Sequence, residues 1–528
     1  MCALSQAEVK KLDLMFEGDS VRDASSGIRG FLFQDYVAIQ NLLDPEVDYV
    51  CSEYLEDVDV FYKDGRFKFI QVKYYPKTNP TMNEISTDLY YQYLRLLMLN
   101  SGLHSVPTLY IHRKGKCRDL NIKKMKKDVQ KYITSGKSLP KKVTFDSSAN
   151  EEIWLRDYVH VETDKDKQKE ALFRDKAAED TLTKFIAAFK VEYLPSILDY
   201  KENLMENLSL AFPNSDVDEE RWQLILLGLA MTYIQRRYMT GASSSAPAQP
   251  NNSNLNQLRV TRDEFKKYIN QSATTKTEQA ITNYLVGRIV ETYGILIHHN
   301  DLTDLQLIML NRIYQHTIPW IAGITETADG QYQMLNTLSK DEASRIARYN
   351  NKSIEGKLTS IAECKDAFRE FLKYLWKIML NICQEQIHTL DEMDKHPELF
   401  NPATYHVKAE KNYLCLKFPQ DVGIDRSIIL PPTNDFPGDK RRVVERMLNM
   451  NEKPQKWFFR NTDLKPGENL YDYSTANIRR KPSITDLGRN SFYIECMECI
   501  GIDEGKWGNR EICGDCIFSM KCVREEKE

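Results

Sequence analysis

Residues 55–77, LEDVDVFYKDGRFKFIQVKYYPK, combine an alternating apolar pattern with four polar residues whose types suit one kind of chemistry. Asp57 and Asp59 stand two residues apart before a glycine turn, and Gln71 and Lys73 stand two residues apart after it. Carboxylate and amide oxygens suit a hard cation such as Mg²⁺. An ammonium group beside them stabilises the charge that develops on a phosphate during cleavage. The pattern therefore favours metal-dependent hydrolysis of a phosphodiester.

A β-hairpin would bring these residues together. We expect a three-residue loop centred on Gly65, since glycine supplies the positive φ that such loops need. Residue 59 would then face residue 71, and residue 57 would face residue 73. Because strand side chains alternate between faces, all four polar side chains would project from one side. The other side would form the core, with Val58, Val60, Tyr62, Ile70, Val72 and Tyr74.

Within this hairpin, either Asp57 or Asp59 would bind the metal. The side-chain carbonyl of Gln71 and the backbone carbonyl of Val72 are further ligand candidates, and Lys73 would contact the phosphate. The alternative is a surface hairpin with paired charges. A cross-strand pair of that kind stabilises a sheet by only about 0.2–1 kcal/mol.

The surrounding sequence alternates between helical and strand-like patterns. Helices are expected at 27–44, 84–99 and 121–133, and strands at 47–55, 58–62, 67–75, 106–112 and 153–163. Helices interleaved with a mixed sheet make an α/β domain, which we assign to residues 1–165.

The N-terminal pattern resembles the DNA endonuclease domain of CD-NTase-associated and HerA-associated anti-phage effectors. That domain belongs to the PD-(D/E)xK, restriction-endonuclease-like superfamily. The residues that carry the resemblance are Gly30, Phe31 and Gln34 on the first helix, the acidic residues Glu53, Glu56 and Asp57, and Gln71, Lys73 and Tyr74 on the second hairpin strand.

The resemblance covers roughly residues 20–165 and implies catalytic roles for Asp57, Gln71 and Lys73, with Glu53 and Gln34 as further site residues. It favours Asp57 over Asp59, which stays a candidate. Gln71 stands where the superfamily usually has an acid. This replacement removes one metal-binding charge and leaves open whether one or two metals bind.

A basic stretch follows within the same expected domain. From Arg113 to Lys142 the chain has 12 basic and two acidic residues, a local charge of +10 (12 − 2) in a chain of net charge −4. Such a patch suits the phosphate backbone of double-stranded DNA, and the alternative is a solvated helix face. The candidate DNA contacts are Lys77, Arg113, Lys114, Lys116, Arg118, Lys123, Lys124 and Lys127.

The rest of the chain has a different character. Residues 166–395 show apolar repeats of helical length, and we expect a helical region for regulation or oligomerisation. The segments with this pattern are 180–194, 221–239, 277–297, 304–324 and 364–387. Residues 240–257, TGASSSAPAQPNNSNLNQ, predict a flexible loop inside it. Residues 396–528 are rich in proline and short strand-like segments, and we expect a C-terminal module there.

Five of the 11 cysteines lie in the last 33 residues. Cys496, Cys499, Cys513 and Cys516 form a CxxC-x13-CxxC pattern, which presents four thiolates to one structural Zn²⁺. Cys522 is a possible substitute ligand. A closed site of this kind stabilises a small fold and performs no catalysis.

The sequence contains no apolar run that could span a membrane and no secretory signal, so a cytoplasmic protein is expected. We expect an Mg²⁺-dependent double-stranded DNA endonuclease that acts in anti-phage defence. The resemblance implies control by a cyclic oligonucleotide, by a HerA-type ATPase or by an SMC-like ATPase. The helical region does not resemble the nucleotide-binding domain of the CD-NTase system, so a partner ATPase or a homo-oligomer is favoured. The alternatives are an inactive DNA-binding scaffold subunit of a defence complex and an enzyme that cleaves RNA.

Overall fold

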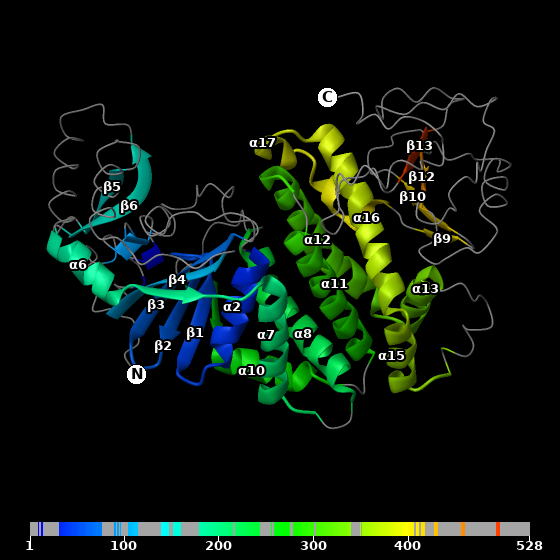
Figure 1. Cartoon of the computed structure of the whole chain (residues 1–528), viewed down its shortest axis with the longest axis horizontal. Coiled ribbons are helices and arrows are strands. Elements are labelled where there is room, and N and C mark those ends of the chain that lie inside the picture. The colour runs from blue at the N-terminus through cyan, green and yellow to red at the C-terminus, as the bar shows by residue number, and fades with distance from the viewer. Residues whose placement is uncertain are drawn as a thin grey trace. The chain divides into compact units, whose positions relative to one another are not determined.

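A computed structural model gives the fold of the chain (Figure 1). The described residues are 31–75, 104–113, 139–146, 151–159, 179–214, 217–242, 258–274, 278–299, 302–338, 351–405, 408–410, 413–417, 427–430, 456–459 and 493–496, with residues 9, 12, 13, 89, 90, 92, 93, 96, 255 and 349.

The chain divides into two compact units. One comprises residues 1–214 and 230–271, and the other comprises residues 215–229 and 272–528. The unit that holds the N-terminal strands therefore continues past residue 165. The three-part division at residues 165 and 395 stays a prediction.

The first unit is built on a mixed six-stranded sheet. Its strand order is β7-β4-β3-β2-β1-β8, with β1 (Val47–Ser52), β2 (Val58–Tyr62), β3 (Arg66–Tyr75), β4 (His104–Arg113), β7 (Lys190–Tyr193) and β8 (Arg259–Thr261). Strands β3, β4 and β7 are parallel, whereas the β1–β2, β2–β3 and β1–β8 pairs are antiparallel. The strands predicted between residues 47 and 112 are confirmed, and the sheet gains both edge strands from later in the chain.

The hairpin register differs from the prediction. Val58 pairs with Ile70, Asp59 with Phe69 and Phe61 with Phe67, so the loop is centred on Asp64 and not on Gly65. Gly65 has a φ of 85° and occupies the last loop position, where its N–H donates to the Tyr62 carbonyl at 3.0 Å. A turn followed by a left-handed glycine explains this register.

Both faces of the sheet are covered, whereas the sequence predicted a core on one face. On one face, Phe33 of α2 (Phe31–Leu43) packs edge-on against Tyr74 of β3 and Tyr200 of α7 (Ile197–Ala211). Figure 1 shows α2 and α7 side by side next to the strands. Alternation along β3 places Phe67 and Phe69 on the opposite face, where Phe61 stacks on Phe67.

Two helices and a pair of strands also belong to the first unit. The α6 helix (Glu179–Ala188) contacts β4, and its Phe185 packs against Tyr90 and Tyr93. The α10 helix (Arg262–Ser272) follows β8, and the β5 (Leu139–Asp146) and β6 (Glu151–Val159) strands form a separate antiparallel pair.

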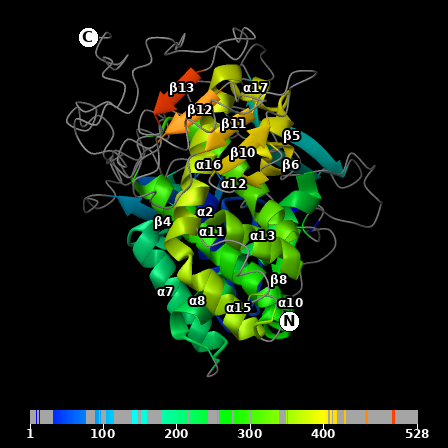
Figure 2. The same cartoon turned by 90° about the vertical axis from the view of Figure 1, so that its right-hand side faces the viewer.

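The second unit is mainly helical. Helices α11 (Gln279–His299), α12 (Asp304–Thr325) and α16 (Lys365–Gln386) contact one another and lie side by side (Figure 2). Trp376 is fully buried, and its indole N–H donates to the Thr317 hydroxyl at 2.9 Å. The shorter helices are α13 (Ala328–Leu338), α15 (Ile354–Glu363), α17 (Leu390–Met393), η3 (Pro397–Phe400) and η4 (Pro402–Tyr405).

A five-stranded sheet lies in the C-terminal part of this unit, in the order β13-β12-β11-β10-β9. Its strands are β9 (Lys408–Glu410), β10 (Tyr413–Lys417), β11 (Ser427–Leu430), β12 (Lys456–Phe459) and β13 (Tyr493–Cys496). The strand-like segments expected after residue 396 thus include β9, β10 and β13.

Two sequence predictions about the middle of the chain need correction. Residues 190–193 form β7, not the end of a helix, because they pair with β4. The predicted loop at 240–257 is shorter than expected: helix α8 (Glu219–Ala242) extends into it, and Leu255 at its other end is buried. Among the described helices, none is long and apolar enough to cross a membrane.

Candidate active site

The loop from Glu53 to Asp57 joins β1 to β2 and is held by hydrogen bonds along its length. The backbone N–H groups of Leu55 and Glu56 donate to Oδ2 of Asp59 at 2.7 and 3.2 Å. The Glu53 N–H donates to the Asp57 carbonyl at 3.2 Å and closes the loop. Glu53 has a φ of 54°, in the left-handed region that non-glycine residues rarely occupy. Such strain persists where the surroundings hold it and often occurs at functional sites.

Asp57 lies at the point where β2 and β3 stop pairing. The first residue of β2, Val58, pairs with Ile70, and one step further the Val72 N–H donates to Oδ2 of Asp57 at 2.7 Å. The Asp57 carboxylate thus takes the place of a ladder partner and lies against the Gln71–Lys73 part of β3. The N–H and C=O of a strand residue point to the same edge, so the Val72 carbonyl faces the same side as Asp57.

Asp59 has a different environment. Its exposed fraction is 0%, and its Oδ2 accepts the two loop N–H groups. Asp57 is only half-buried. Of the two aspartates that the sequence left open, Asp57 has the accessible carboxylate, and Asp59 holds the loop that carries it.

Two glutamines supply buried amide oxygens. Gln71 is 6% exposed and Gln34 on α2 is 1% exposed. Neither Oε1 atom accepts a hydrogen bond from any residue that the structure describes. A buried carbonyl without a donor costs about 1–3 kcal/mol, so a cation or an ordered water is the expected partner.

The residues around Asp57 fit a hard divalent cation. An accessible carboxylate, the Gln71 amide oxygen and the Val72 carbonyl are all oxygen donors of the kind that Mg²⁺ takes, with water completing its shell. Within the described ranges, no three His, Cys, Asp or Glu side chains gather as a metal site. A site at Asp57 would therefore depend on amide and backbone oxygens and on solvent.

The other predicted site residues lie as follows. Lys73 is half-buried on β3 and pairs in register with Ile111 of β4, while alternation places it on the face of Gln71 and Asp59. Arg113 ends β4, and the DNA-contact candidates Lys77, Lys114, Lys116, Arg118, Lys123, Lys124 and Lys127 lie outside the described residues. Cys496 ends β13, and Cys499, Cys513, Cys516 and Cys522 also lie outside the described residues.

The residues that support the loop carry no signal in the sequence. Tyr54 donates from its hydroxyl to Asp13 at 2.8 Å, and the Gln92 amide donates to the Leu55 carbonyl at 3.3 Å. Both partners are about 40 residues away along the chain. No local pattern signals a contact of this kind, since it depends on the tertiary fold.

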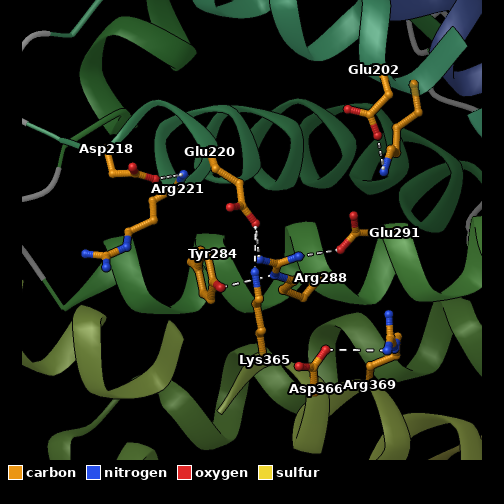
Figure 3. A network of polar contacts seen from close by, with 11 residues as sticks. Glu202, Asp218, Glu220, Arg221, Tyr284, Arg288, Glu291, Lys365, Asp366 and Arg369 are labelled. Atoms are coloured by element: carbon orange, nitrogen blue, oxygen red, sulfur yellow. Dashed lines mark hydrogen bonds and ion pairs between the residues drawn. The ribbon is translucent and has the colours of Figure 1, made fainter. Parts of the chain in front are cut away.

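A second polar cluster lies in the helical unit (Figure 3). Arg288 of α11 donates to Glu220, Glu291 and the Tyr284 hydroxyl at 2.8, 2.6 and 3.0 Å, and Lys365 of α16 reaches Glu220 at 3.4 Å. The Arg288 guanidinium, with Lys365 next to it, lowers the pKa of the Glu220 carboxyl. Its opposite charges join α8, α11 and α16, so we interpret this cluster as a structural contact between helices and not as a second active site.

Comparisons of the chain with known protein families, with curated proteins and with solved structures give no match.

Proposed function

We propose that the protein is a metal-dependent endonuclease that cleaves double-stranded DNA at Asp57, Gln71 and Lys73. The observation that carries the proposal is the contact of Asp57 with Val72 at the open end of the hairpin, beside a buried Gln71 oxygen that lacks a donor within the described residues. The sequence pattern Asp-x13-Gln-x-Lys, shared with the resembled nuclease domain, supports it.

Each residue would have a separate task. Asp57, Gln71 and the Val72 carbonyl would hold Mg²⁺, which when bound activates a water and neutralises phosphate charge. Lys73 would place its ammonium group at the phosphate and stabilise the negative charge of the transition state. Asp59 would keep the loop in the conformation that presents Asp57.

Double-stranded DNA is the proposed substrate because of the basic stretch between Arg113 and Lys142. Contacts to phosphates are independent of sequence and weaken steeply with salt. Such an enzyme needs restraint in its own cell. Because the resembled nuclease domain occurs in anti-phage effectors, we propose a role in defence, under control of a partner ATPase or of self-assembly, and a cytoplasmic location.

A catalytically inactive DNA-binding scaffold is the second candidate. It is favoured by one observation: the neighbouring ligand candidate, Gln71, is an amide instead of an acid. The zinc site at Cys496, Cys499, Cys513 and Cys516 stays a separate prediction with a structural role.

The test compares Lys73→Ala with Lys63→Ala, an exposed lysine in the turn of the same hairpin. Wild type and Lys63→Ala should degrade plasmid DNA with Mg²⁺, alone or assembled with a candidate ATPase. Lys73→Ala should lose at least about 100-fold in rate, as expected for loss of one charge-stabilising group, while DNA binding in a gel-shift assay is retained.

Cleavage that persists in Lys73→Ala would refute the proposed site. A wild-type protein that binds DNA but cuts neither plasmid nor labelled RNA under any of these conditions would establish the scaffold instead. Cleavage of RNA but not of DNA would make RNA the substrate instead of double-stranded DNA.

A further inference from the structure

One carboxylate oxygen joins three segments that are far apart in the sequence. Asp13 is 8% exposed, and its Oδ1 accepts a hydrogen bond from the Tyr54 hydroxyl at 2.8 Å and from the Leu255 N–H at 2.9 Å. Tyr54 belongs to the Glu53–Asp57 loop. Leu255 lies shortly before β8, and we call Leu255 together with β8 the returning segment. Asp13 therefore links this loop to a part of the chain about 200 residues later.

The β8 strand attaches the same returning segment a second time. Cys51 of β1 pairs with Arg259 of β8 in an antiparallel register. Leu255 precedes Arg259 by four residues, and its N–H donates to Asp13, which also accepts the Tyr54 hydroxyl. The β1 strand, which ends at Ser52 just before the loop, pairs with β8. The loop itself is attached to Leu255 through Asp13.

The loop needs support from outside itself. Its first residue, Glu53, is in a left-handed conformation that persists only where the surroundings hold it. Asp59 and Val72 fix the other end of the loop, at Leu55–Asp57. Tyr54, which is 1% exposed, is the residue next to Glu53 and anchors this strained end.

The chemistry of the contact makes it persistent. Burial, and next the negative charge of Asp13, raise the pKa of the Tyr54 hydroxyl well above its ordinary value. The hydroxyl therefore stays protonated and donates a hydrogen bond to Asp13. Hydrogen bonds to an ionised carboxylate are shorter and stronger than neutral ones. A buried tyrosine that lost this acceptor would leave its hydroxyl without a partner of the same strength.

We propose that Asp13 is a positioning residue, which together with Leu255 and β8 holds the Glu53–Asp57 loop in the conformation that lets Asp57 bind a divalent cation. This inference rests on the proposed function. It makes metal affinity depend on the returning segment, which does not itself touch the metal site.

The test uses the full chain and two measurements that do not need catalysis. Manganese binding is followed by isothermal titration calorimetry, and the exchange of the Leu55 and Glu56 amides is followed by hydrogen–deuterium exchange. Tyr54→Phe removes only the hydroxyl, and Asp13→Ala removes the acceptor. Both should weaken Mn²⁺ binding about tenfold, as expected for loss of a buried bond to a charged group, and should speed exchange of both amides.

Two variants serve as controls. Asp13→Asn retains an oxygen that can accept both bonds and should restore most of the affinity. Tyr49→Phe removes a hydroxyl from the neighbouring strand β1 and should bind Mn²⁺ as wild type does. In the active protein, the Mg²⁺ concentration for half-maximal cleavage should rise about tenfold in Tyr54→Phe, and DNA affinity should stay the same.

The inference is overturned if Tyr54→Phe and Asp13→Ala bind Mn²⁺ as wild type does, or if Tyr49→Phe weakens binding equally. Faster amide exchange with unchanged metal affinity would also overturn it, since the contact would then be structural only. If wild type binds Mn²⁺ but cleaves no nucleic acid, the proposed function fails while the metal titration still decides the role of Asp13.

Discussion

Replacement of Asp59 should mainly lower stability, whereas replacement of Asp57 should mainly abolish cleavage. Oδ2 of Asp59 accepts two backbone N–H groups in a fully buried position. A hydrogen bond to a charged group contributes about 1.5–3 kcal/mol, so Asp59→Ala should lower the free energy of unfolding of the sheet by about 3–6 kcal/mol. Asp57 accepts one such bond and is half-buried, where water replaces part of the loss, so Asp57→Ala should cost about 1–2 kcal/mol.

Urea unfolding separates the two variants. With a urea dependence of about 2 kcal/mol per molar, the midpoint should fall by about 1.5–3 M for Asp59→Ala and by at most about 1 M for Asp57→Ala. Hydrogen exchange of peptides from β1, β2 and β3 at increasing urea reports on this sheet alone. Plasmid cleavage with Mg²⁺ should be lost in Asp57→Ala, although that variant stays folded.

Asp59→Asn provides the decisive control. Its amide oxygen can still accept both loop N–H groups, so the variant should lose about 1–3 kcal/mol and keep its activity. If Asp59→Asn is folded but inactive, the Asp59 carboxylate has a chemical role and the assignment to Asp57 is wrong. A larger loss of stability in Asp57→Ala than in Asp59→Ala would refute the reasoning as well.

Two further predictions concern the helical unit. An added Cβ at Gly228 would lie 2.1 Å from the backbone oxygen of Asn283, whereas at Gly323 nothing lies within 4 Å. Gly228→Ala should therefore destabilise this unit by at least about 1–3 kcal/mol, and Gly323→Ala should stabilise it by up to about 1 kcal/mol; calorimetric midpoints that move in the same direction would contradict the helix packing. Because the pKa of Glu220 is lowered from 4.5 in the folded protein, its ion pair contributes fully above that pH and is lost as the pH falls below it. Glu220→Gln should flatten the fall in unfolding free energy below pH 4.5, and an unchanged acid slope in urea titrations would show that the pair contributes nothing.

The hairpin strands show where pattern-based prediction succeeds. The alternation of apolar residues in 58–62 and 67–75 predicted both hairpin strands, and β2 and β3 lie there. Helical periodicity likewise predicted α11, α12 and α16 to within a few residues. Periodicity is a local property, because burial of one face of an element imposes it on consecutive residues.

The register of the hairpin was not fixed by that pattern. A shift of two residues leaves every side chain on its original face, so alternation could not distinguish a loop centred on Gly65 from one centred on Asp64. The turn geometry decided between them, since Gly65 adopts a φ of 85° at the end of the loop. The edge strands β7 and β8 were missed because short segments become strands only through the neighbours with which they pair.

By itself the sequence determined which chemistry the chain can offer: one acidic cluster, a Gln-x-Lys strand, a basic stretch and a four-cysteine tail. The resemblance already favoured Asp57 over Asp59, but only the tertiary structure shows how the surroundings of these two residues of the same type differ. Burial turned Asp59 into a support for the loop, and the end of strand pairing left Asp57 accessible beside Val72. Contacts across the fold, such as that of Asp13 with Tyr54, leave no trace in the local pattern, since they join segments that only folding brings together.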